Sequence, residues 1–206
     1  MKGVILPMNN AKKSLRVEIT KKVTATALAW ALIGNSTAIN VYAKSSYSIS
    51  ESYSYSSSSY LAGTSGISEE DFMFAMKNCK YDKNGVLADN AECIWNVCQE
   101  YNINEILFVG LIAAESGWCT SNMSTSKKNI LSITASGGYK TYSSYADCIK
   151  DGIVLLSNNY CKSDGKYYTG GTLYDIGTIY CGVNSAEWCK LIINCADLFT
   201  KTLEEK

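Results

Sequence analysis

The sequence from residue 104 to 121, NEILFVGLIAAESGWCTS, ends the longest apolar run in the second half of the chain with an acidic residue. Asn104 is a suitable N-cap, and residues 106–114 are all apolar or glycine. This pattern predicts a helix that is buried on nearly every side. Gly117 is expected to end it, because glycine readily adopts the left-handed conformation found after a helix. Any chain that folds around this segment must use it as a central helix.

The acid on this helix is Glu115, which shares one stripe with three apolar residues, Phe108, Leu111 and Ile112, at the spacing i, i+3, i+4, i+7. It lies in the last turn, where the negative helix end and the apolar surroundings both disfavour ionisation. A carboxylic acid that donates a proton at neutral pH needs such a setting. Glu115 is therefore a candidate general acid; the alternative is a helix-end acid turned to solvent.

The N-terminal region resembles a secretory signal. Six basic residues within the first 22 precede an uncharged apolar stretch, residues 23–43, that ends in Val41-Tyr42-Ala43. Small residues at the last and third-last places predict cleavage after Ala43. The alternative is a retained membrane anchor, although polar residues dilute the second half of the stretch and a spanning helix needs about 20 mostly apolar residues.

Charge and residue types exclude several classes of function. Without residues 1–43, the chain has 13 basic and 18 acidic residues, which gives a net charge of −5, and no arginine remains. Nucleic acid is therefore excluded as the expected partner, since phosphate binding relies on clustered Lys and Arg. The chain has no histidine, which excludes Ser-His-Asp and Cys-His catalysis and the usual zinc sites. We expect acid and base chemistry to come from carboxylates, tyrosines or lysines.

Nine cysteines all follow residue 43. In an exported chain, this number predicts up to four disulfides and one free thiol, with a pairing that the sequence leaves open.

The chain divides into a signal (1–43), a Ser/Tyr-rich flexible spacer (44–66) and one folded domain (67–206). Helices are expected after the caps Ser68, Ser143 or Ser144, Thr172 and Ser185, and over about 91–101. Alternation around Gly137-Gly138 predicts a small hairpin between 129 and 144. The expected fold is mainly α, with a helical domain around a central buried helix and a small β-hairpin lobe.

Four motifs occur in a familiar order: AESGW (114–118) with Thr120-Ser121, NILSI (129–133), YKTYSSY (139–145), and YTGGTL (168–173) with IGTIY (176–180). Together they resemble glycoside hydrolase family 73, the endo-β-N-acetylglucosaminidases among the cell-wall autolysins. The resemblance covers about residues 67–200. It implies a lysozyme-like fold, peptidoglycan glycan strands as the partner, no metal or organic cofactor, Glu115 as general acid and Tyr180 facing the cleft. Cys119 stands where this family has glycine, and we expect a disulfide to hold it.

The resemblance does not supply a second carboxylate. Glycosidases generally use two, and many members of the family carry the second in the hairpin lobe, yet residues 130–144 contain no Asp or Glu. Asp147 or Asp151 on the following helix could act as the base. Alternatively, the N-acetyl group of the substrate could attack with help from Tyr180, or the enzyme could be weak. We favour attack by the N-acetyl group of the substrate, with help from Tyr180.

The resemblance and side-chain chemistry indicate further substrate-binding residues. Amphipathic aromatic side chains suit a saccharide groove, which makes Trp118, Tyr139, Tyr142 and Tyr145 candidates for contact with sugar rings. For Trp118 the competing interpretation is a core residue. Asn129 is expected either to hold the turn beside Glu115 or to bond an N-acetyl group.

The expected function is that of a secreted or wall-associated peptidoglycan hydrolase, a monomer without a membrane anchor after signal cleavage. Two alternatives remain open. The same fold could serve an N-acetylmuramidase or lytic transglycosylase, or the domain could be a non-catalytic wall-binding module.

Overall fold

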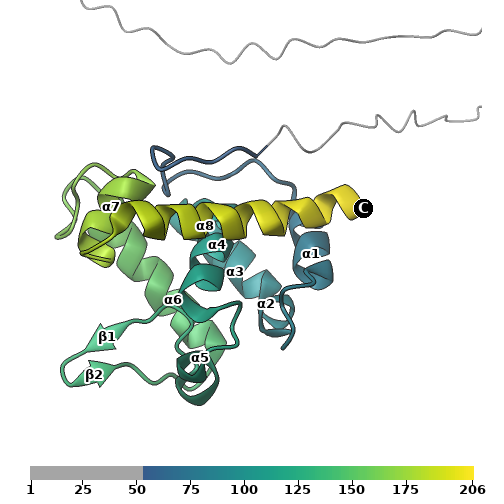
Figure 1. Ribbon diagram of the computed structural model, residues 1–206, viewed down its shortest axis with the longest axis horizontal. Helices are drawn as coiled ribbons and strands as arrows, with labels where there is room; N and C mark the ends of the chain where they lie inside the picture. The colour runs from purple at the N-terminus through teal and green to yellow at the C-terminus, as the bar shows by residue number, and fades with distance from the viewer. Residues whose placement is uncertain (1–52) are drawn as a thin grey trace, which may run out of the picture. The chain divides into compact units, whose positions relative to one another are not determined.

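The computed structural model describes residues 53–206. The expected signal and residues 44–52 of the spacer lie outside this range. Its helices and strands are α1 (Glu69–Asn78), α2 (Val86–Asp89), α3 (Ala91–Tyr101), α4 (Glu105–Ser116), α5 (Asn122–Lys127), β1 (Thr134–Ala135), β2 (Gly138–Tyr139), α6 (Tyr145–Leu155), the π-helical η2 (Leu156–Cys161), α7 (Leu173–Tyr180), α8 (Ser185–Thr200) and the 3-10 segment η3 (Lys201–Glu205). The mainly helical architecture is confirmed (Figure 1).

Helix α4 is the central helix expected from the sequence. The Asn104 side chain accepts a hydrogen bond from the Leu107 N–H at 2.9 Å, and Gly117 follows the helix with φ 58°. The apolar run between them is buried from Ile106 to Ala113. Its main partner is α8, the long helix that crosses the domain in Figure 1. The predicted start, end and burial of the central helix are therefore confirmed.

Most other predicted caps are also confirmed. Ser68 caps α1, Ser144 caps α6, and Thr172 forms a reciprocal capping box with Asp175. The last helix differs by one residue, because Ser185 is its first helical residue and is preceded by a left-handed Asn184. Helices α2 and α5 were not expected, since four and six residues are too short to show a 3.6-residue period.

The predicted hairpin is also present. Strands β1 and β2 pair antiparallel, with Thr134 opposite Tyr139 and Ala135 opposite Gly138. Figure 1 shows this lobe extending from the helical body beside α5 and α6. No helix within residues 53–206 is long and apolar enough to cross a membrane.

Residues 53–66 pack against the folded domain, and we call them the strap. Leu61 is only 1% exposed, and its carbonyl accepts a hydrogen bond from the Asn104 N–H at 2.8 Å. The carbonyl of Ser59 accepts another from the Leu173 N–H at 2.8 Å, so the strap joins the start of α4 to the start of α7. The prediction of a flexible spacer is therefore wrong for residues 53–66. Backbone hydrogen bonds and one buried leucine hold this polar segment against the domain.

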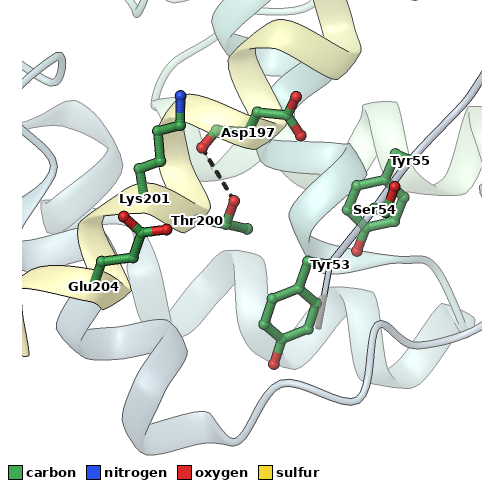
Figure 2. A pocket seen from close by; sticks show the side chains of 7 residues that line it. All are labelled: Tyr53, Ser54, Tyr55, Asp197, Thr200, Lys201 and Glu204. Atoms are coloured by element: carbon green, nitrogen blue, oxygen red, sulfur yellow. Dashed lines mark hydrogen bonds between the residues drawn. The ribbon is translucent and has the colours of Figure 1, made fainter. Parts of the chain in front are cut away.

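The first residues of the strap lie beside the end of α8 (Figure 2). The Tyr55 hydroxyl donates to Asn104 Oδ1 at 3.3 Å, and burial raises the pKa of Tyr55 to about 12. A pocket of about 280 Å³ separates strap and helix, and burial also raises the pKa of Asp197 on its α8 side. Its lining is Tyr53, Ser54, Tyr55, Asp197, Thr200, Lys201 and Glu204. No candidate site residue from the sequence lies there.

The docked strap predicts that Leu61→Ala destabilises the protein by about 2–5 kcal/mol, because it removes a fully buried side chain. Urea unfolding followed by circular dichroism measures this loss. Ser58→Ala is the matched control, since the Ser58 side chain is exposed on the same segment. Equal stability of Leu61→Ala and the control would contradict the docked arrangement.

Candidate active-site groove

A groove of about 680 Å³ opens on the side of the domain that carries the hairpin. Segments far apart in the sequence meet there: the end of α4, the hairpin, η2 with the loop after it, α7 and the first turns of α8. The lining residues are Glu115, Ser132, Ile133, Thr134, Tyr139, Leu155, Tyr160, Tyr167, Ile179, Tyr180, Cys181 and Trp188. The two residues expected to act in catalysis, Glu115 and Tyr180, therefore share one groove.

Glu115 is the only carboxylate among these lining residues. Its side chain is partly exposed, and Oε1 accepts a hydrogen bond from the Trp188 indole N–H at 2.8 Å. Trp188 is 9% exposed, so the donor is held firmly by its packing. The indole orients the carboxyl group and stabilises negative charge on it. No residue in 53–206 bonds Oε2, which leaves that oxygen available to a substrate.

The position of Trp188 depends on close packing between α7 and α8. A Cβ placed on Gly177 of α7 would lie 2.9 Å from the Trp188 ring, so a side chain at this position would push the indole away. On the groove side, the ring packs against Tyr180 with 5.6 Å between ring centroids. Both contacts direct the indole N–H toward Glu115.

Tyr180 connects α7 to the base of the hairpin lobe. Its hydroxyl donates to the Leu131 carbonyl at 2.6 Å. Burial, followed by the nearby Glu115 charge, raises the pKa of Tyr180 well above its usual value, so the phenol stays neutral. Because its proton is committed to Leu131, the Tyr180 oxygen is best placed to accept a hydrogen bond from a ligand.

Asn129 is buried and fully engaged in the turn that begins the lobe. Its Nδ2 donates to the carbonyls of Ile133 at 2.8 Å and Lys140 at 3.0 Å, and its Oδ1 accepts from the Ile133 N–H at 3.0 Å. Of the two roles considered from the sequence, these bonds favour holding the turn.

Neither candidate second acid lines the groove. The Asp151 carboxylate accepts from Lys140 at 2.7 Å and from the Tyr142 hydroxyl at 2.6 Å. Burial would raise the pKa of Asp151, but these two donors lower it overall. Asp147 is exposed, and its carboxylate accepts from the Ser143 hydroxyl. Asp151 thus joins the residues after β2 to α6, whereas Asp147 bonds only at the start of that helix.

The candidate aromatic residues separate into two groups. Tyr139 on β2 is 49% exposed and lines the groove. Trp118 stacks on Tyr81 with ring centroids 5.1 Å apart, and Tyr145 is the partly buried first residue of α6. Neither of them, nor Tyr142, is among the lining residues.

Sequence reasoning missed three aromatic residues of the groove. Trp188 lies on the buried face of α8, and only its polar N–H distinguishes it from a core residue. Tyr160 and Tyr167 lie on η2 and in the loop after it. Their signal was weak, because a π-helical turn has no characteristic pattern of residue types.

The nine cysteines are all free thiols in the structure, so the expected disulfides are not formed. Cys119 is buried, with its sulfur 3.7 Å from the Ser116 hydroxyl rather than joined to another cysteine. Burial raises the pKa of Cys119 to about 12, which makes this thiol unreactive. Within residues 53–206, no three His, Cys, Asp or Glu side chains gather into a group that could hold a metal ion.

No family model and no curated protein matches this chain. Among solved structures it is similar to the catalytic domain of the autolysin Auto from Listeria monocytogenes, with a TM-score of 0.42 and 18% sequence identity. The similarity covers 60% of this chain and 88% of that one. At this level of likeness, the function must be argued from the residues of the groove.

The hydrogen bonds of Asn129 predict that Asn129→Ala lowers the free energy of unfolding by about 1–3 kcal/mol, because three backbone groups, two of them in buried bonds, lose their partner. Thermal or urea unfolding measures the change. Asn122→Ala, at an exposed position on α5, is the control and should match the wild type. An unchanged stability of Asn129→Ala would show that the turn does not depend on these bonds.

Proposed function

We propose that the protein is an exported, monomeric peptidoglycan hydrolase that cleaves the glycan strand at N-acetylglucosamine. One observation carries the proposal: a single carboxylate, Glu115, lies in a groove lined by aromatic side chains and is oriented by the Trp188 N–H. The ordered sequence motifs around Glu115 and Tyr180 support the same conclusion. Tyrosine and tryptophan rings suit sugar rings, which have apolar faces and polar edges.

Glu115 acts first as a general acid. It donates a proton to the glycosidic oxygen, and the bond from that oxygen to C1 breaks as positive charge develops on the sugar. The remaining carboxylate keeps its hydrogen bond from Trp188, which stabilises the charge left on the enzyme. In the second half of the reaction the same carboxylate takes a proton from the water that attacks C1.

The nucleophile in this proposal is the acetamido group of the substrate. Its carbonyl oxygen attacks C1 as the leaving group departs, and water then opens the cyclic intermediate to the free sugar. The Tyr180 oxygen is placed to accept from the acetamido N–H, because its own proton is donated to Leu131. This bond would hold the acetamido group against C1 and increase the electron density on its carbonyl oxygen.

A second candidate function is favoured by the absence of any carboxylate besides Glu115 among the lining residues. A lytic transglycosylase needs only one, because the 6-hydroxyl group of N-acetylmuramic acid attacks C1 in place of water. An N-acetylmuramidase is the hydrolytic form of this alternative. Reducing-end analysis of digested peptidoglycan separates the three: new N-acetylglucosamine supports our proposal, and new N-acetylmuramic acid or its 1,6-anhydro form supports the alternatives.

The proposal predicts that Glu115→Gln lowers peptidoglycan hydrolysis by about 10²–10⁴-fold, the usual contribution of a general acid. Clearing of cell-wall substrate in a gel and release of soluble reducing ends measure the loss. Glu187→Gln, an exposed acid on α8, is the matched control and should keep full activity.

Asp147→Asn should retain activity, and Asp151→Asn, which weakens the bonds to Lys140 and Tyr142, should lose far less activity than Glu115→Gln, because neither acid lines the groove. A loss equal to that of Glu115→Gln in either variant would restore a second protein carboxylate to the mechanism. Equal or absent clearing by wild type and Glu115→Gln would instead support the non-catalytic wall-binding module.

The hydrogen bond from Trp188 predicts a loss of turnover for Trp188→Phe. This substitution removes the N–H that donates to Glu115 and keeps an aromatic ring at the position. Steady-state kinetics should show kcat lowered about 10–100-fold, the value of one hydrogen bond to a charged group, with circular dichroism confirming the fold. An unchanged kcat would show that the indole N–H does not assist the acid.

A further inference from the structure

The aromatic side chains of the groove continue beyond the catalytic centre in a connected series. Tyr160 lies 5.8 Å from Tyr180, measured between ring centroids, and Tyr167 lies 5.1 Å from Tyr160. All three line the groove, and Tyr180 packs in turn on Trp188. The proposed mechanism uses Tyr180 and Trp188 but leaves Tyr160 and Tyr167 without a role.

Tyr160 has the feature that distinguishes a ligand contact from a core residue. The residue is only 7% exposed, so packing holds its ring in place, yet its hydroxyl bonds no residue within 53–206. Because Tyr160 lines the groove, this hydroxyl is open to a ligand or to water there. The Tyr167 hydroxyl is also without a partner among these residues. Burial raises the pKa of Tyr160, which keeps its hydroxyl proton available for donation.

The chain uses unusual backbone geometry to place these two residues. Helix α6 widens into the π-helical η2, a conformation that is found often at functional sites. The following loop then folds back, and the Tyr167 N–H donates to the Asn159 carbonyl at 2.8 Å. Gly165 makes this return possible, because a Cβ there would lie 2.7 Å from the Asn159 carbonyl oxygen.

The arrangement of the rings decides how a ligand can meet them. The Lys166 ammonium lies 4.9 Å from the centroid of the Tyr167 ring, while Tyr160 packs against the same ring. With these two neighbours against the ring, the Tyr167 hydroxyl is the group that we expect to contact a sugar. Two neighbouring phenol hydroxyls are suited to the hydroxyl and acetamido groups of a neutral amino sugar.

We propose that Tyr160 and Tyr167 form a second sugar-binding subsite, which hydrogen-bonds the N-acetylhexosamine unit next to the one attacked at Glu115. This inference rests on the proposed function for the identity of its ligand. The subsite extends recognition of the glycan strand along the groove and away from the reacting bond.

The test is a calorimetric titration with the pentamer of N-acetylglucosamine, carried out in the full chain with Glu115→Gln to prevent turnover. Adding Tyr160→Phe removes only the hydroxyl and should raise Kd about tenfold, and Tyr167→Phe should act in the same direction. Tyr174→Phe, an exposed tyrosine on α7 outside the groove, is the matched control and should leave Kd unchanged. Circular dichroism confirms that each variant folds.

The outcomes separate this inference from the proposed function. An unchanged Kd for both Tyr160→Phe and Tyr167→Phe, or no binding of the pentamer to Glu115→Gln, overturns the subsite even if the wild type clears cell walls. A Kd that depends on Tyr160 in a protein that clears no cell wall supports the subsite and overturns the hydrolase.

Discussion

The groove depends on the contact between α4 and α8 at Gly110. A Cβ at this position would lie 2.7 Å from the Ile192 carbonyl oxygen and 3.1 Å from the Ala196 side chain, so the two backbones approach too closely for any other residue. The helices cross in opposite directions, and Trp188 therefore reaches the end of α4 one turn before Ile192. A wider spacing would withdraw the indole from Glu115. The geometry of the acid is thus set by a glycine that touches no substrate.

Two glutamates at the ends of α4 show how the surroundings assign different roles to the same side chain. Glu105 is fully buried in the first turn, where the helix dipole favours a negative charge, and it accepts bonds from the N–H and hydroxyl of Ser65 at 3.2 and 2.6 Å. Glu115 lies at the end that disfavours a negative charge and has one donor, Trp188. The strap satisfies the first acid, which becomes structural. The second keeps an oxygen without a partner that a substrate can use.

Local signals in the sequence were sufficient for α4, its caps and the hairpin, because periodicity, Asn104 and Gly117 act over a few residues. The same reasoning failed where a position depends on distant segments. Leu61 is ordered by one backbone bond from Asn104, about 40 residues away in the chain, and composition could not show this. Trp188 resembles a core residue until α4 is placed beside it. The cysteines were assigned to disulfides by their number alone, whereas pairing depends on three-dimensional distances that a count does not contain.

The chemistry proposed for the groove follows from how the lobe uses its charges. Asp151 holds Lys140 and Tyr142, and these bonds join the hairpin to α6. Tyr180 joins the same lobe to α7 through the Leu131 carbonyl. Because the hairpin lobe is bonded to both α6 and α7, it is suited to keeping the groove at a constant width. It does not supply a carboxylate to the groove. A mechanism in which the substrate supplies its own nucleophile fits this division: the protein provides one acid, a neutral phenol and a rigid set of rings, and the reacting sugar provides the rest.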